Sequence, residues 1–411
     1  MRRLKDILSV ENLDRLANYS FVVYGFLLPL SRAAISFFSI LIFAVWIQKI
    51  IRTKDFSIFK EKPVFFFLLF LIFSTISILW TNPLYIDNAI DILRKYMYLW
   101  AFLAYAAIIE KKYAKYAIKT FIVGLAISSL ISYGVFFEFI SLHGVLPQNP
   151  SPIMHHIVYS IFLAIGAAFL LHRILNNNLN KGRRFFDLFL FILLSGNLFL
   201  INGRTGQIAF IAAVGVVVYL YYRFSLKSLI LLGFLLFSIL FSAYHLSDNF
   251  NYRVKATIKN TIDAVENDNY FESVGQRIGT WIISEEMIKK KPLLGYGIGS
   301  EMPAFYKYTK TDRKYRFYTE LGFPHMHNQY LQILLQTGVM GLGIFVLFLV
   351  FLFRSPTTNR QIRDIKYIFL TIFILGFFAE PLISHRNFSM GLFAFLSGIV
   401  LVFSKEKAVE R

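Results

Sequence analysis

The stretch Pro324-His325-Met326-His327-Asn328-Gln329-Tyr330-Leu331 marks the point where a long polar segment ends and a long apolar run begins. The polar segment covers 245–325, and the apolar run continues to about residue 353. We therefore expect a helix to begin beside the two histidines. A helix N-terminus carries unpaired N–H groups and about half a positive charge. Its field disfavours a protonated imidazole and attracts phosphate.

These two effects make His327 a candidate base beside an anion site. The alternative is that His327 caps the helix or lies at a membrane interface, and the spacing alone leaves both interpretations open. His325 lies two residues earlier, before the helix is established, so we expect it to feel no such fixed field. It is a candidate for substrate binding only.

The rest of the chain is unusually apolar. It is 56% hydrophobic with a mean hydropathy of +0.57, whereas soluble domains are about 45–50% apolar. Apolar runs of about 20 residues recur, each long enough to cross a bilayer. A β-barrel would show short alternating segments instead. The sequence therefore predicts an all-α, polytopic membrane protein with about twelve spans, near 19–31, 33–51, 64–80, 96–110, 117–140, 153–172, 185–201, 206–222, 226–244, 328–353, 366–379 and 388–404.

Lysine and arginine predict the orientation of these spans. With the N-terminus inside, the segments on the inside carry 26 basic residues, and the short outer loops carry only five: Arg32, Arg94, Lys95, Arg204 and Arg386. Both termini are then cytoplasmic, and 245–325 lies outside with 81–95, 141–152, 202–205 and 380–387. The asymmetry accounts for most of the net charge of +19 without nucleic acid as a partner. The first 18 residues show no cleavage pattern, so we expect the first span to be an uncleaved anchor.

We divide the chain into transmembrane helices 1–9 over 1–244, a periplasmic loop domain over 245–325 and transmembrane helices 10–12 over 326–411. Within the loop, Ile278, Trp281, Ile282 and Ile288 predict one face of a helix that ends at Lys289-Lys290-Lys291 and Pro292. Residues 307–316 are strongly basic, which indicates either a solvated face or a landing site for anionic lipid. No cysteine is present for disulfides or thiolate metal sites.

Lysine and arginine are disfavoured in the short outer loops of a membrane protein, so the basic residues found there need another explanation. Arg204 lies in the short turn Asn202-Gly203-Arg204-Thr205-Gly206, whose glycines allow the backbone to approach a ligand. Arg277 stands at the start of the loop helix, where the helix dipole opposes a cation, and Arg386 precedes the last span. Each arginine either holds an anion or extends to lipid headgroups.

Two further motifs have simpler interpretations. Gly295-Tyr296-Gly297-Ile298-Gly299-Ser300 lacks the ending of a phosphate loop and is interpreted as a backbone turn. Asp87 and Asp91 have the spacing of one helix face, which suits a metal pair, but Arg94 and Lys95 follow at once and favour a solvated ion-pair cluster.

Several short motifs, in this order and topological placement, resemble the O-antigen ligase family of the O-antigen ligase/polymerase superfamily. They are Arg204-Thr-Gly, Ser273-Val-Gly-Gln-Arg277 before a tryptophan-containing helix, and His327-Asn328 followed by Leu334, Gly338 and Gly341-Leu342. The spacing of Glu380 and Arg386 is also similar to the family's last periplasmic turn, although an aspartate is more usual there.

The resemblance implies a membrane glycosyltransferase with a GT-C-like fold, in the inner membrane of a Gram-negative bacterium. It would transfer glycan from undecaprenyl pyrophosphate to the lipid A-core oligosaccharide on the periplasmic side, with inversion and without a metal or other cofactor. By the same resemblance Arg204 and Arg277 hold the donor pyrophosphate and His327 serves the acceptor hydroxyl. His325, Asn328, Glu380 and Arg386 are assigned to substrate binding, with Glu380 and Arg386 expected to matter least.

Three other functions fit part of the sequence. A polysaccharide polymerase would use the same donor with another lipid-linked glycan as acceptor, and an oligosaccharyltransferase would glycosylate protein. A twelve-span transporter of lipid-linked sugars would show two similar halves and a midplane site, whereas the loop divides these spans nine and three.

Overall fold

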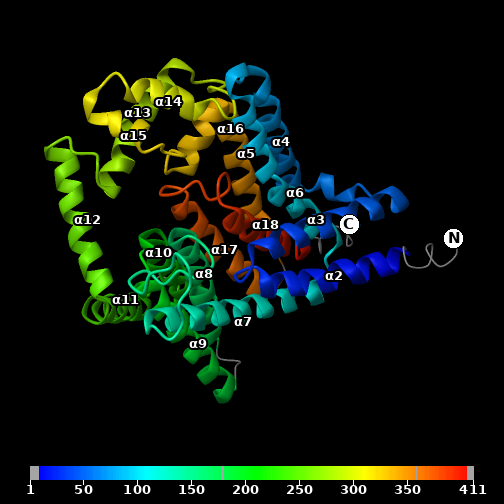
Figure 1. Cartoon of the computed structure of the whole chain (residues 1–411). Helices are drawn as coiled ribbons and strands as arrows, with labels where there is room; N and C mark the ends of the chain where they lie inside the picture. Colours follow the sequence, from blue (N-terminus) through cyan, green and yellow to red (C-terminus); the bar gives the residue numbers. More distant parts are fainter. Residues whose placement is uncertain (1–8, 177–179, 224, 358, 405–411) are drawn as a thin grey trace.

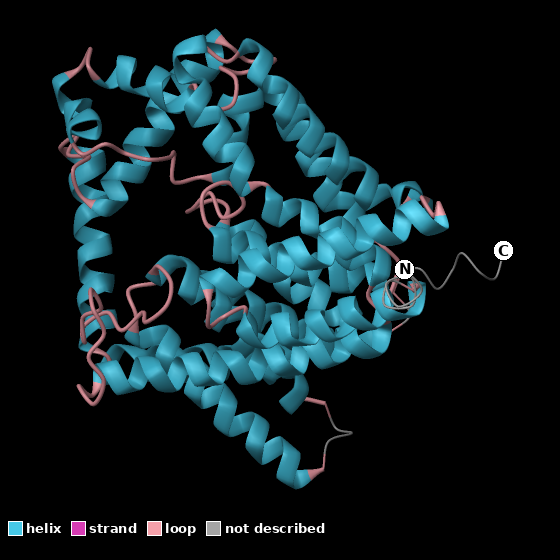
Figure 2. Ribbon diagram, turned by 45° about the vertical axis from the view of Figure 1, so that its right-hand side comes forward, coloured by secondary structure: helices cyan, strands magenta, loops and turns pink. Residues whose placement is uncertain are grey.

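The computed structural model describes residues 9–176, 180–223, 225–357 and 359–404, and within these ranges it is helical, with no β-strand (Figure 2). Ser9, Ser31, Asn180, Ser247 and Asn328 each cap the helix that follows by accepting a backbone N–H. Some basic residues counted above toward the inner side lie outside the described residues, namely Arg2, Arg3, Lys5, Lys405, Lys407 and Arg411.

Each predicted span corresponds to a helix. These helices are α2 (Val10–Leu27), α3 (Arg32–Thr53), α4 (Lys62–Ile76, extended by η2, Ser77–Trp80), α6 (Met97–Ile108), α7 (Lys111–Phe136), α8 (His156–Ile174), α9 (Lys181–Leu200), α10 (Arg204–Tyr222), α11 (Leu226–Leu246), α16 (Gln329–Arg354), α17 (Arg360–Gly376) and α18 (Asn387–Val402). The other helical elements of the described chain are η1 (Ser57–Lys60), η3 (Pro83–Tyr85), α5 (Ile86–Lys95), α12 (Asp248–Glu266), α13 (Ser273–Lys290), α14 (Glu301–Thr309), η4 (Arg313–Tyr315) and α15 (Arg316–Glu320).

Seven helices of the described chain are long and apolar enough to cross a membrane: α3, α4 with η2, α7, α8, α10, α11 and α16. α18 is a shorter apolar helix. These helices indicate a multi-pass membrane protein, but the predicted count of twelve spans is not confirmed.

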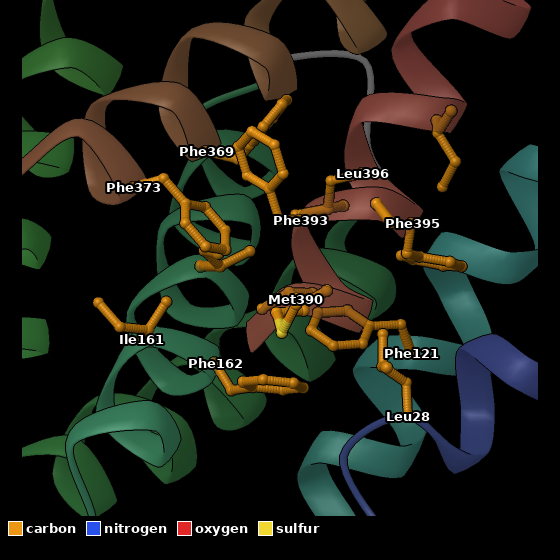
Figure 3. Packing of buried hydrophobic residues seen from close by; sticks show 14 of the residues in the cluster. Leu28, Phe121, Ile161, Phe162, Phe369, Phe373, Met390, Phe393, Phe395 and Leu396 are labelled. Carbon is orange, nitrogen blue, oxygen red and sulfur yellow. The ribbon is translucent and has the colours of Figure 1, made fainter. Parts of the chain in front are cut away.

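The bundle core forms where α8, α17 and α18 meet α2 and α7 (Figure 1). Figure 3 shows Phe369 and Phe373 of α17 against Phe393 of α18, and Phe121 of α7 beside Phe395. α8 is the innermost of the long apolar helices, with 89% of its apolar stretch buried, whereas only 6% of the apolar stretch of α11 is buried. The surface of α11 is therefore available to lipid.

The segment between α11 and α16 forms a second cluster, separate from the bundle core. α12 runs along one side of the molecule from α11 toward α13, and α13–α15 lie together above the bundle (Figure 1). Buried side chains from α13, α14 and α15, including Met287, Phe305 and Tyr318, pack beneath Phe323 and Met326.

The predicted loop helix is present as α13. Trp281 and Ile282 are exposed, and the buried face consists of Gly275, Gly279, Thr280, Ile283, Ser284 and Met287. The reason is close packing: a Cβ at Gly279 would lie 2.3 Å from the hydroxyl of Tyr318. Small and polar residues therefore make this contact.

α16 is not one continuous helix. Gly338 has φ 66° and ψ −169°, which interrupts the helix, and a Cβ there would lie 2.0 Å from the Leu293 carbonyl oxygen. The Gly295–Gly299 turn supplies the missing hydrogen bonds: Tyr296 N–H donates to Leu335 O and Gly297 N–H to Gln336 O. The interpretation of this glycine motif as a turn is thus confirmed, and these N–H groups serve the α16 backbone.

Candidate functional site

The site begins at the turn that enters α16. Asn328 caps the helix, its side-chain oxygen accepting the N–H groups of Tyr330 and Leu331. His327 precedes this cap with φ 51°, a conformation that a non-glycine residue adopts rarely and that often marks a functional constraint. Asn328 was predicted to bind substrate, and the structure gives its side-chain oxygen a capping role.

Gln329 joins this turn to the segment after α17. Its backbone N–H donates to Phe377 O at 2.7 Å, and its side-chain amide bonds the Ser384 hydroxyl and the Ile383 N–H. Gln329 is fully buried. These bonds fix the turn that carries Glu380 against the start of α16.

Glu380 is the centre of the resulting cluster and is fully buried. One carboxylate oxygen, Oε1, lies 3.4 Å from His325 Nε2 and 3.0 Å from Arg386 Nε. The other, Oε2, lies 3.4 Å from His327 Nδ1, which is within ion-pair distance, and neither atom has a hydrogen-bond partner among the described residues. Glu380 therefore touches both histidines and the arginine that the sequence placed apart from them.

The charge state of the cluster follows from its contacts. Burial opposes ionisation of Glu380, but His325, His327 and Arg386 more than offset it and hold the pKa of this carboxyl well below its usual value. Burial also lowers the pKa of His325, more than Glu380 raises it, so that imidazole is neutral. His325 Nδ1 accepts the backbone N–H of His327, which leaves the proton on Nε2, facing Glu380.

An ionised carboxylate beside His327 Nδ1 favours the tautomer with the proton on that nitrogen. The other ring nitrogen, Nε2, is then the proton acceptor. A buried carboxylate that orients an imidazole and stabilises its protonated form is the arrangement of a general base. The His327 side chain is 19% exposed, so a ligand can reach the ring.

Arg204 and Arg277 meet at Ser273, the first residue of α13. Arg204 donates to the Ser273 hydroxyl at 2.6 Å, and Arg277 donates to the Ser273 carbonyl oxygen at 2.9 Å. Arg204 also donates to Thr257 on α12 at 2.6 Å. Burial lowers the pKa of Arg277, and Glu380 partly opposes that shift. The two guanidinium groups thus come from separate elements but share one residue.

Arg277 also connects the basic group to the histidine cluster. Its Nε donates to Ala379 O at 3.4 Å, directly before Glu380. Arg253 of α12 donates to Asn202, beside Arg204, and both Arg253 and Arg277 repel Arg204 electrostatically. Three cations gathered against their mutual repulsion form a site suited to a multiply charged anion such as pyrophosphate.

The structure therefore brings together Arg204, Arg277, His325, His327, Glu380 and Arg386. Sequence reasoning missed Arg253 and Ser273 as site residues. The spacing of Arg253 and Thr257, one helical turn apart and so on one face of α12, is the signal that was available. The glycines around Arg204 have a different role from the predicted one: a Cβ at Gly206 would lie 2.3 Å from the backbone of Ser160, so this turn is packed against α8.

Within the described chain, one group has ligand atoms close enough for a metal ion. It consists of His325, His327 and Glu380, whose ligand atoms lie within 4.8 Å of one another. However, Arg386 already occupies Oε1 of Glu380, and His325 would have to release its Nε2 proton before that nitrogen could bind a metal. The alternative pair, Asp87 and Asp91, lies on exposed α5, where Asp91 pairs with Arg94 at 3.2 Å.

The fold and this site define a multi-pass helical membrane protein that carries a cationic, histidine-containing site at its helix ends. Comparison with known proteins agrees. The family model described as O-antigen ligase matches residues 189–346, a range that includes Arg204, Arg277 and His327. The predicted resemblance to the O-antigen ligase family is thereby confirmed.

Two curated relatives are similar to parts of the chain. A Rickettsia conorii protein named "Putative polysaccharide ligase" is 34% identical over 113 residues, which is 25% of this chain and 26% of the relative. An uncharacterized protein of Haemophilus influenzae is 25% identical over 196 residues, 45% of this chain and 49% of that protein. The matched regions thus span half or less of either relative.

Proposed function

We propose that this protein transfers O-antigen glycan from undecaprenyl pyrophosphate to lipid A-core oligosaccharide, at the periplasmic side of a Gram-negative inner membrane, with inversion and without a metal ion. The observation that supports this most is the contact of a three-arginine group with the His327–Glu380 pair through Arg277 and Ala379. An anion-binding group and a base are thereby placed side by side.

The chemistry follows from these residues. Glycosyl pyrophosphate is already activated, so the transition state mainly requires neutralisation of the departing charge, which Arg204 and Arg277 supply. The acceptor hydroxyl gives its proton to His327 Nε2 as its oxygen bonds the anomeric carbon, and the bond from that carbon to the pyrophosphate oxygen breaks. Lipid pyrophosphate leaves with the electron pair. One displacement inverts the anomeric centre and needs no protein nucleophile.

The placement of these residues agrees with the predicted orientation. Arg204 begins α10, His327 precedes α16 and Arg386 precedes α18, so all three stand at helix ends that the charge bias puts outside. At the opposite ends, Lys115 of α7 lies over the ring of Phe403, just beyond α18, and Asn18 of α2 accepts the N–H of Glu110. This arrangement supports cytoplasmic termini, a periplasmic 245–325 segment and a GT-C-like architecture.

The test is reconstituted transfer in detergent with purified lipid-linked donor and lipid A-core. His327→Ala should retain donor binding, and its transfer rate should be about 10²–10⁴-fold lower, which is the contribution expected of a general base. His327→Gln should recover part of it only if the ring acts through hydrogen bonding. Activity should survive a chelator; loss to chelator and recovery with a divalent metal would contradict the metal-free mechanism. Elongation of lipid-linked glycan without transfer to lipid A-core would identify a polymerase instead.

A further inference from the structure

A cavity of about 640 Å³ is lined by none of the residues of the histidine cluster. It forms between the turn that ends α4, the C-terminal end of α13 and α14. Trp80 and Tyr85 come from the turn, Lys290 and Lys291 from the end of α13, and Lys307 from α14. Its described lining contains three lysines and no acidic residue.

The walls of this cavity are fixed by hydrogen bonds between distant segments. Trp80 Nε1–H donates to Leu294 O at 2.9 Å, and the Thr81 hydroxyl donates to Ile298 O at 2.7 Å. The Asn82 N–H donates to the Ser300 hydroxyl at 2.9 Å. The two loops are thus held together, and the cavity between them is preformed.

Lysines and aromatic rings alternate in this lining. Lys290 Nζ lies 4.5 Å from the ring centroid of Tyr308, and Lys291 Nζ lies 4.9 Å from that of Tyr296. Flat aromatic faces pack well against the apolar faces of sugar rings, and lysine is a common ligand of phosphate. This combination fits a phosphorylated saccharide.

Exposed leucines stand in or next to the segments that line this cavity. Leu79 lines it and is 80% exposed, and Leu84, between the lining residues Pro83 and Tyr85, is 83% exposed. Leu293 and Leu294, shortly after Lys291 in the chain, are 64% and 43% exposed. Soluble proteins expose isolated leucines, but four exposed leucines on the segments that form one cavity, at the end of an apolar helix, suit contact with acyl chains. A ligand here can therefore have both a charged saccharide head and a lipid tail.

Not all of the basic residues predicted as a lipid landing site contribute to this cavity. Lys314 pairs with Asp268 at 3.5 Å, and Arg316 lies 3.4 Å from Glu320. Lys307 is the member of the 307–316 run that lines the cavity. The structure thus singles out one residue of that run and adds Lys290 and Lys291 from α13.

We propose that this cavity binds the phosphorylated saccharide head of an anionic glycolipid in the outer leaflet, and that this glycolipid is the acceptor. The inference rests on the proposed function for the identity of the acceptor. Lys290, Lys291 and Lys307 bind its phosphates, the aromatic side chains bind its sugar rings, and the leucines contact its acyl chains. The cavity is a binding subsite, separate from the reacting atoms.

Equilibrium binding of purified lipid A-core to His327→Ala protein in nanodiscs tests this without turnover. The additional change of Lys290, Lys291 and Lys307 to alanine should raise the Kd at least tenfold. Dephosphorylated lipid A-core should bind the parent with a similar loss. The matched control replaces three exposed lysines outside the cavity, Lys259, Lys289 and Lys310, and should leave the Kd within twofold. An unchanged Kd in the cavity variant would overturn the proposal.

Two further experiments distinguish lipid A-core from other anionic lipids as the ligand, and distinguish failure of the subsite proposal from failure of the proposed function. Phosphatidylglycerol added at equal concentration should not displace lipid A-core; full displacement would show a general anionic-lipid site and refute the acceptor assignment. In transfer assays with otherwise wild-type protein, the lysine variant should raise the acceptor KM about tenfold with little change in kcat. Lysine-dependent binding without any transfer by the wild type would refute the proposed function but not the subsite.

Discussion

Replacement of Glu380 by glutamine is the most informative perturbation of this site. The substitution keeps the size of the side chain and removes its charge. Glu380 Oε2 lies 3.4 Å from His327 Nδ1, and Glu380 is fully buried. At an effective dielectric constant of about 20, unit charges at that separation interact by about 5 kcal/mol. The wild-type protein gains this interaction when the imidazole becomes protonated in the transition state, and the glutamine variant lacks it.

A barrier increase of this size corresponds to about 10³–10⁴ in rate, and the glutamine dipole retains part of it. We therefore expect Glu380→Gln to lower kcat about 10²–10⁴-fold with little change in donor affinity. From the sequence we expected Glu380 to matter less than Arg204 and Arg277, whereas its contact with His327 leads us to expect the larger effect from Glu380. The assay is the reconstituted transfer reaction at saturating donor and acceptor.

Glu301→Gln provides a matched control. Glu301 is also fully buried, and its Oε1 accepts the side-chain amides of Gln332 and Gln336 at 2.7 Å each. Burial raises the pKa of this carboxyl, which favours its neutral form, and glutamine has the size of that neutral form. We expect near wild-type turnover from Glu301→Gln. Wild-type turnover from correctly folded Glu380→Gln protein would refute the role of Glu380 in orienting the base.

Three further outcomes are expected. Arg204→Lys and Arg277→Lys should each lower activity at least tenfold at normal protein levels, because lysine keeps the charge but loses the two-pronged grip on phosphate; full activity of both alanine variants would reduce these residues to lipid contacts. The folded state lowers the pKa of His325, so below pH 6.5 the unfolded chain gains a proton there that the folded chain does not. His325 should therefore remove up to about 1.4 kcal/mol of unfolding free energy per pH unit as the pH falls from 6.5 to 4.5, in addition to the contributions of His155 and His385, whose pKa values burial also lowers. His325→Gln should flatten that dependence, and an unchanged slope would show that another group is responsible. Single cysteines at Asn267 and Lys181, both exposed, should label from opposite sides of the membrane, and labelling from one side would contradict the charge-based orientation.

The apolar helices were predictable because their signal is local. A run such as 206–222 is apolar regardless of its neighbours, and the capping oxygen of Asn328 stands directly before the helix that it starts. Arg204, Arg277 and His327 were candidates for a related reason: each is a polar residue in a place where hydropathy, topology or the helix dipole makes it unusual.

Only the tertiary structure placed Glu380 between His325 and His327. That contact depends on Gln329 bonding the turn after α17, and such pairing between distant segments has no periodic signal in the sequence. The same holds for Arg253, which joins the basic group through its hydrogen bond to Asn202, and for the buried face of α13, where glycines and small polar residues lie beside Ile283 and Met287. Sequence determined which helices form, because that depends on neighbouring residues; packing determined which charges meet, because that depends on contacts between segments far apart in the chain.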